Sequence, residues 1–61
     1  MKLIKYGRTA DGKTWGIAEE DHKYWLITGR TIFHVEDQIR EGELTDVYPN
    51  FKRAFEAAKE L

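Results

Sequence analysis

The alternation of apolar and polar positions predicts short strands in the first half of the chain. Residues 2–6 mix leucine, isoleucine and tyrosine with lysines, which is typical of a strand with one face exposed to solvent. Residues 7–12, GRTADG, are turn formers, and Asp11-Gly12 favours a tight hairpin because both residues tolerate positive φ. We therefore expect a hairpin that connects the first strand to a second one.

The second expected strand, residues 13–18, has one bulky face and one flat face. Trp15 and Ile17 share the bulky face because side chains alternate along a strand. The flat face carries only small residues, namely Thr14, Gly16 and Ala18. Small side chains let another element approach closely. We expect Trp15 and Ile17 to be buried under a helix at the C-terminal end of the chain.

A charged turn at residues 19–22 leads into a third expected strand at residues 23–28. Its apolar side chains divide between the two faces, with Tyr24 and Leu26 on one and Trp25 and Ile27 on the other. A strand that is apolar on both faces is expected to be buried on both sides. If the domain docks on a partner, either Tyr24 or Trp25 should remain partly exposed.

Residues 31–41 fit either a fourth strand or a helix. The β-branched and aromatic residues at the start of this segment favour a strand, whereas later apolar residues lie four positions apart, as on a helix. We predict extended structure to Phe33 and a short helix over residues 34–41. Gly42 suits the left-handed conformation in which helices commonly end.

The last segment, residues 50–61, has the pattern of an amphipathic helix. One stripe is apolar and consists of Phe51, Ala54, Phe55, Ala58 and Leu61. Pro49 fits the first turn of this helix, where its missing N–H has no partner to lose. Together the segments predict an α+β fold, in which a small antiparallel sheet of three to four strands packs against the C-terminal helix. The short helix predicted over residues 34–41 would be a second helix of this fold.

The length and the absence of cysteine both predict a domain of low stability. The chain has 61 residues, which is one domain at most, residues 1–61. A domain of this size buries only about 60% of the surface that its unfolded chain exposes. No disulfide or thiolate metal site can compensate, because the chain has no cysteine. We therefore expect a protein partner, a homodimer, or attachment to a larger protein.

The charge balance removes several classes of partner. Ten lysines and arginines against eleven acidic residues give a formal net charge of −1. No overall field would attract nucleic acid or anionic lipid, so nucleic-acid binding is not expected. No apolar run approaches the roughly 20 residues that span a bilayer, and the N-terminus lacks the apolar segment of a signal peptide. We expect a cytoplasmic protein without membrane contact.

Two histidines are the main candidates for catalysis or metal binding. His22 lies in a charged turn, where solvation is the simpler interpretation. A helix that starts near His34 would place Asp37 and Gln38 on the same face as His34, but one histidine and one carboxylate do not make a zinc site. The chain also has no nucleophile elbow and no glycine-rich phosphate loop. We expect no catalysis by the chain on its own, no cofactor and no metal.

Interaction through the surface is the remaining possibility. Arg8 and Arg30 each follow a glycine in an expected loop, an arrangement that can present them to an anion, although loop arginines are more often only solvated. The aromatic residues could form a base-stacking platform, but a chain this short needs them in its core. The candidate interaction surface consists of Tyr24, Trp25, Arg8, Arg30 and His34.

The order of these features resembles the small N-terminal domain of the fumarylacetoacetate hydrolase family. The resemblance rests on MKL at positions 1–3, WGI at positions 15–17, and YP at positions 48–49 before the last helix. It extends over nearly the whole chain. The chain departs from the family pattern in its second turn, where Asp21-His22 replaces an Asp-Gly pair, and in its third strand, where Trp25-Leu26-Ile27 replaces Ile-Asp-Leu.

The resemblance implies a non-catalytic accessory role. In that family the metal-binding carboxylates and the catalytic machinery lie in a larger C-terminal domain, so no catalytic residue is carried over to this chain. The expected function is to support or cover a metal-dependent active site that another polypeptide supplies. The alternative is a small phage- or plasmid-type protein that binds and inhibits a host protein, which an exposed apolar patch away from the sheet edge would favour.

Overall fold

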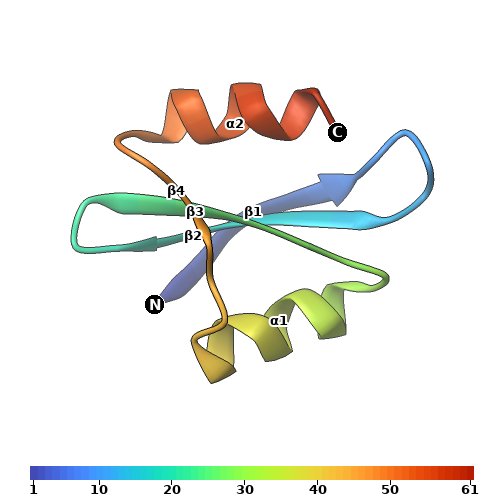
Figure 1. The fold of residues 1–61 in the computed structure, drawn as a ribbon, viewed down its shortest axis with the longest axis horizontal. Coiled ribbons are helices and arrows are strands. Elements are labelled where there is room, and N and C mark those ends of the chain that lie inside the picture. The colour runs from blue at the N-terminus through green and yellow to red at the C-terminus, as the bar shows by residue number, and fades with distance from the viewer.

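The computed structural model describes residues 1–61 and contains one four-stranded antiparallel sheet with a helix on each face (Figure 1). In chain order the elements are β1 (Lys2–Arg8), β2 (Thr14–Glu20), β3 (Lys23–Gly29), α1 (Ile32–Glu41), β4 (Asp46–Tyr48) and α2 (Phe51–Lys59). The strands lie in the sheet in the order β1-β2-β3-β4. The predicted α+β class is confirmed, and α1 is the short second helix.

The β1–β2 hairpin is longer than the sequence pattern predicts. β1 continues through Gly7 to Arg8, so Arg8 is a strand residue and not a loop residue. The turn is closed by Thr9, whose N–H donates to the Lys13 carbonyl at 2.9 Å and whose carbonyl accepts from Gly12 at 3.1 Å. Gly12 alone in this turn has positive φ, +86°, which fits a three-residue loop ending in a left-handed residue.

The β2–β3 hairpin is also tighter than expected. β2 includes Glu19 and ends at Glu20, which pairs with Lys23. The turn therefore contains only Asp21 and His22. Both turn residues have positive φ, 53° and 62°. Two-residue hairpin turns of this kind match the twist of the strands, but they impose a left-handed backbone that glycine and asparagine accept more easily than histidine.

Helix α1 begins earlier than predicted, so the expected extended structure at residues 31–33 is wrong beyond Thr31. Thr31 is the N-cap, and its hydroxyl accepts a hydrogen bond from the His34 N–H at 3.2 Å. This cap, together with packing of the helix on the sheet, overrides the strand preference of the β-branched and aromatic residues that follow. The predicted end is confirmed, because Gly42 adopts the left-handed conformation with φ 73°.

The fourth strand lies where no strand was predicted, at Asp46–Tyr48, and pairs with β3. Helix α2 follows after Asn50, whose side chain accepts from the Arg53 N–H at 2.9 Å. Pro49 therefore precedes the cap and does not lie in the first turn of α2. β4 pairs with Tyr24, Trp25 and the next residue of β3. It is too short to show a periodic pattern in the sequence.

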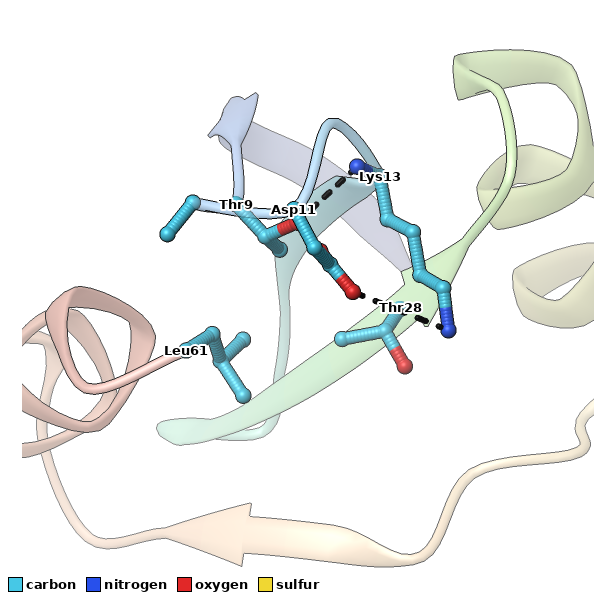
Figure 2. A pocket seen from close by; sticks show the side chains of 6 residues that line it. Thr9, Asp11, Lys13, Thr28 and Leu61 are labelled. Atoms are coloured by element: carbon cyan, nitrogen blue, oxygen red, sulfur yellow. Dashed lines mark hydrogen bonds and ion pairs between the residues drawn. The ribbon is translucent and has the colours of Figure 1, made fainter.

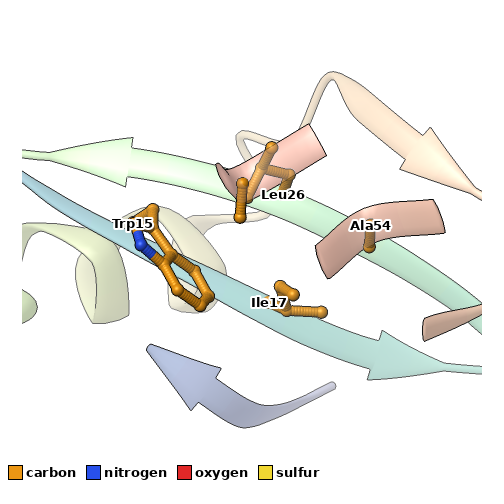
Figure 3. Close-up of a cluster of buried hydrophobic side chains, with 5 residues drawn as sticks. Trp15, Ile17, Leu26 and Ala54 are labelled. Atoms are coloured by element: carbon orange, nitrogen blue, oxygen red, sulfur yellow. The ribbon is translucent and has the colours of Figure 1, made fainter. Parts of the chain in front are cut away.

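The core between α2 and the sheet confirms the prediction for the bulky face of β2. Trp15 is 8% exposed and Ile17 is fully buried, and both lie beneath α2 with Leu26 and Ala54 (Figure 3). The rings of Trp15 and Phe55 have centroids 6.0 Å apart. Small residues on the inner side of α2 let the helix approach the two large side chains of the sheet.

The flat face of β2 receives α1, as the small residues there suggest. A Cβ atom on Gly16 would lie 2.7 Å from Cγ1 of Val35, which is fully buried at the centre of α1. Ala18 and Ile27 complete this second cluster. With one helix on each face, β3 is covered on both sides, as predicted from its two apolar faces.

Candidate functional site

A groove at the start of α1 is the larger of two concave surfaces on the chain. It is lined by Tyr6, Gly7 and Arg8 of β1, by Thr14 of β2, and by residues 30–33 at the start of α1. Its volume is about 330 Å³. We call it the arginine groove, because it brings together Arg8 and Arg30, which are far apart in the sequence.

The strand register explains why these side chains share one face. Tyr6 pairs with Gly16 and Arg8 pairs with Thr14 in the antiparallel ladder. Directly opposed residues project to the same side of a sheet, and Gly16 faces Val35 of α1. Tyr6, Arg8 and Thr14 are therefore on the α1 face, at the end where that helix begins.

Two large aromatic side chains are exposed at this groove. Phe33 is 73% exposed and Tyr6 is 63% exposed, the two highest values among the large apolar residues of the chain. Phe33 lies in the first turn of α1 but outside the core that Val35 and Ile39 form with the sheet. Exposed aromatic residues next to arginines are the side chains that most often dominate protein interfaces.

The charge in the groove is not neutralised within the chain. None of the lining residues is acidic. Arg30 makes no ion pair and no side-chain hydrogen bond. Arg8 makes one long hydrogen bond, from Nη1 to the Gly12 carbonyl at 3.4 Å. Most of the donors of both guanidinium groups remain available.

The N-terminus of α1 adds backbone donors to the same place. The first N–H groups of a helix have no acceptor within the helix. Thr31 satisfies the N–H groups of His34 and Val35, through its hydroxyl and its carbonyl respectively. The N–H groups of Ile32 and Phe33 have no such partner. The first turn of α1 contains no acidic residue that would neutralise the positive end of the helix dipole.

Thr14 lies at the inner part of the groove and is the one buried polar residue of the chain. The residue is 8% exposed, and its hydroxyl makes no hydrogen bond within the chain. No fully buried side-chain oxygen or nitrogen lacks a partner anywhere in the chain. The Thr14 hydroxyl must therefore keep some contact with solvent, and the groove that it lines provides it.

A second concavity lies between the β1–β2 turn and the C-terminus (Figure 2). Its volume is about 270 Å³, and its walls include Asp11, Lys13, Thr28 and Leu61. Asp11 accepts a hydrogen bond from the Thr9 hydroxyl, which lowers the pKa of the Asp11 carboxyl, and Lys13 adds a smaller effect in the same direction. Because Asp11 and Lys13 also form an ion pair at 4.0 Å, the charges here are matched within the hairpin.

The structure does not bring the five predicted surface residues together. Tyr24 is half-buried on the α2 face, where its hydroxyl donates to Glu19 Oε2 at 2.9 Å and its ring meets Phe51 edge-on. That hydrogen bond raises the pKa of the Tyr24 phenol. Trp25 is half-buried on the opposite face, against the α1 cluster. If the domain docks on a partner, one of these two aromatic residues is expected to stay partly exposed. Both are partly exposed, on different faces of the sheet.

His34 is exposed and does not line the arginine groove. Its ring lies over Gly29, where an added Cβ would come within 3.0 Å of Nδ1. The sequence reasoning identified both arginines but missed Phe33, Tyr6 and Thr14 as their neighbours. Only the register of β1 against β2 and the early start of α1 place them together, and neither is visible in a single sequence.

No group of three or more histidine, cysteine, aspartate or glutamate side chains lies close enough together to hold a metal ion. None of the helices has the length and apolar character needed to cross a bilayer. Comparison with protein-family models, curated proteins and solved structures finds no match to this chain.

Proposed function

We propose that the chain is a non-catalytic accessory domain that docks on another protein through the arginine groove and the two aromatic side chains beside it. The observation that carries this proposal is the clustering of Phe33 and Tyr6, the most exposed large apolar residues, with Arg8 and Arg30. Aromatic and arginine side chains at the centre of an interface contribute most of the binding energy in many complexes.

Charge complementarity specifies the partner surface. Because the groove has two arginines, the start of a helix and no acidic residue, a partner that places aspartate or glutamate against it would satisfy donors that are now free. A second copy of this chain fits less well, since the same positive surface would have to meet itself in a two-fold dimer. The occupant proposed here is an acidic surface of a different protein.

The sheet edge is a poorer docking site than the groove. β1 is the long edge strand, and its pairing with β2 is interrupted by an irregularity between Leu3 and Lys5. Such bulges, and lysines such as Lys2 on an edge strand, discourage pairing with a further strand. β4 at the other edge is only three residues long. Docking through a face is therefore favoured over extension of the sheet.

The partner suggested by the sequence resemblance is the catalytic domain of a fumarylacetoacetate hydrolase-like enzyme. In this proposal the chain supports or covers the metal-dependent active site of that domain and contributes no catalytic residue. Inhibition of an unrelated acidic protein is the second candidate. Part of the same observation favours it, because Phe33, the most exposed large apolar residue, lies in the first turn of α1 and away from the strand edges.

The test is site-specific cross-linking with such a catalytic domain. A photoreactive residue at Phe33 should give a one-to-one adduct that increased salt suppresses, whereas the same residue at Lys52, on the exposed side of α2, should give none. Arg30→Glu should weaken the complex about tenfold or more, while Arg53→Glu, an equal charge reversal on α2, should have little effect. These results would support the hydrolase assignment.

Two results would overturn that assignment. One is a strict monomer in sedimentation equilibrium that forms no adduct with the catalytic domain at tens of micromolar. The other is a homodimer that forms through Phe33, which would make a second copy the partner. Circular dichroism of each variant confirms that it is folded, so that loss of binding is not loss of structure.

A further inference from the structure

Several hydrogen-bond donors line the arginine groove, and most of them have no acceptor within the chain. They are the guanidinium groups of Arg8 and Arg30, the N–H groups of Ile32 and Phe33, and the Thr14 hydroxyl. The start of a helix alone is a general feature of proteins and would not indicate a ligand. Two arginines from separate parts of the chain, neither of them in an ion pair, make this place distinctive.

Thr14 is the independent observation that points to a bound group. Polar side chains that are more than nine-tenths buried are normally paired within the protein. Thr14 is 8% exposed and its hydroxyl has no partner in the chain; because no fully buried polar atom is unpaired, this hydroxyl reaches solvent through the groove that it lines. A hydroxyl can donate one hydrogen bond and accept others, so a ligand oxygen placed in the groove would satisfy it.

We propose that the arginine groove binds a small phosphate monoester. A dianionic phosphate matches the charge of Arg8 and Arg30, and its oxygens can accept from the α1 N–H groups in the manner common at helix N-termini. A single carboxylate has half that charge and would leave one guanidinium without a partner. Phe33 and Tyr6 supply apolar surface for the organic part of the ester, and a groove of about 330 Å³ suits a small molecule.

This inference rests on the same surface as the proposed docking function and goes beyond it, because a phosphate ester and an acidic protein surface would compete for the same donors. It does not require the protein partner. The two can therefore fail separately: phosphate binding is measured on the isolated chain, whereas docking is measured with the catalytic domain.

The experiment is a titration of the ¹⁵N-labelled chain followed by NMR. Inorganic phosphate should shift the amide signals of Ile32 and Phe33 in a saturable manner, whereas chloride at matched ionic strength should not. Phenyl phosphate should bind more tightly than inorganic phosphate, because its ring adds contacts with Phe33 and Tyr6. Phenol alone should show no saturable shift at these amides.

Variants separate a built site from general attraction to positive charge. Arg30→Gln should weaken phenyl phosphate binding about tenfold or more. Thr14→Val keeps the shape and the buried methyl group, and should weaken binding about three- to tenfold through loss of the hydroxyl alone. Arg53→Gln removes an equal charge from the opposite side of the molecule and should leave the affinity unchanged.

Three outcomes would overturn the inference. The first is the absence of saturable shifts at Ile32 and Phe33 with either phosphate. The second is equal weakening by Arg30→Gln and Arg53→Gln, which would indicate only a diffuse charge effect. The third is binding of single-stranded oligonucleotides whose affinity rises with length and exceeds that of phenyl phosphate, which would reassign the surface to nucleic acid. Urea unfolding of Thr14→Val confirms that the variant is folded.

Discussion

Substitution of Gly16 by alanine tests whether close approach of α1 to the sheet holds the fold together. An added Cβ would lie 2.7 Å from Val35 Cγ1 and 2.9 Å from Leu3 Cδ1, whereas ordinary contact begins at about 3.4 Å. The Leu3 methyl group can rotate away. Val35 is fully buried and β-branched, so it has one strongly preferred rotamer in a helix, and α1 itself must move by several tenths of an ångström.

The size of the effect follows from two opposing contributions. Forcing an extra methyl group into a packed core typically costs about 1–3 kcal/mol. Alanine in place of glycine within a strand stabilises the folded state by about 0.5–1 kcal/mol, because glycine loses more conformational freedom on folding. Because Val35 is fully buried and cannot rotate away, we take the upper part of that cost, about 2–3 kcal/mol, and expect Gly16→Ala to lower the free energy of unfolding by about 1–2.5 kcal/mol. For a domain of this size that corresponds to a fall in Tm of roughly 4–20 °C.

Urea unfolding monitored by tryptophan fluorescence measures this change, and a double-mutant cycle identifies its cause. Val35→Ala is destabilising alone, because it leaves a cavity. In the double variant the two changes should compensate, with a coupling energy of about 1 kcal/mol or more. If Gly16→Ala is neutral or stabilising, or if the two effects simply add, then α1 does not pack on Gly16 as described.

Three further substitutions test local features. His22→Gly should raise the free energy of unfolding by about 0.5–1 kcal/mol in urea denaturation, because His22 has a left-handed backbone with φ 62°. Thr31→Ala should lower the free energy of unfolding by about 1 kcal/mol and reduce amide protection in the first turn of α1, since it removes the cap on His34. Asp11 has a lowered pKa in the folded state, so its contribution to stability is present above its unfolded pKa, near 3.8, and is lost as pH falls through the folded pKa. Asp11→Asn should therefore be less stable than the parent at pH 7 and should converge with it at about pH 2 in urea denaturation.

The sequence was informative where a pattern repeats and where a residue has a single structural role. The stripe of α2, the bulky and flat faces of β2, and Gly42 at the end of α1 each depend on side chains within one element. Periodicity detects such elements because helix and strand geometry are local. These features account for the correct fold class and for the two-sided burial of β3.

The predictions from sequence are wrong or incomplete where tertiary contacts determine the local structure. β4 has three residues and owes its conformation to pairing with Tyr24 and its neighbours, so no local pattern could show it. Residues 32–33 have a strand preference, but the Thr31 cap and the packing of Val35 on Gly16 make them helical. That change moves Phe33 to the first turn of α1 and places it beside Arg30. The groove could not be predicted because it depends on this helix start and on the β1–β2 register together.

The segment that carries Arg30 is held at both ends, which bears on whether the groove is a site or only a solvated surface. On one side, Gln38 Nε2 donates to the Thr28 carbonyl at 2.7 Å and Gly29 is buried beneath His34. On the other, Thr31 caps the helix. The backbone that presents Arg30 and the two free N–H groups is therefore fixed before any ligand binds, so binding must order mainly the arginine side chains. This preorganisation would lower the entropic cost of binding at the groove that we propose as a site.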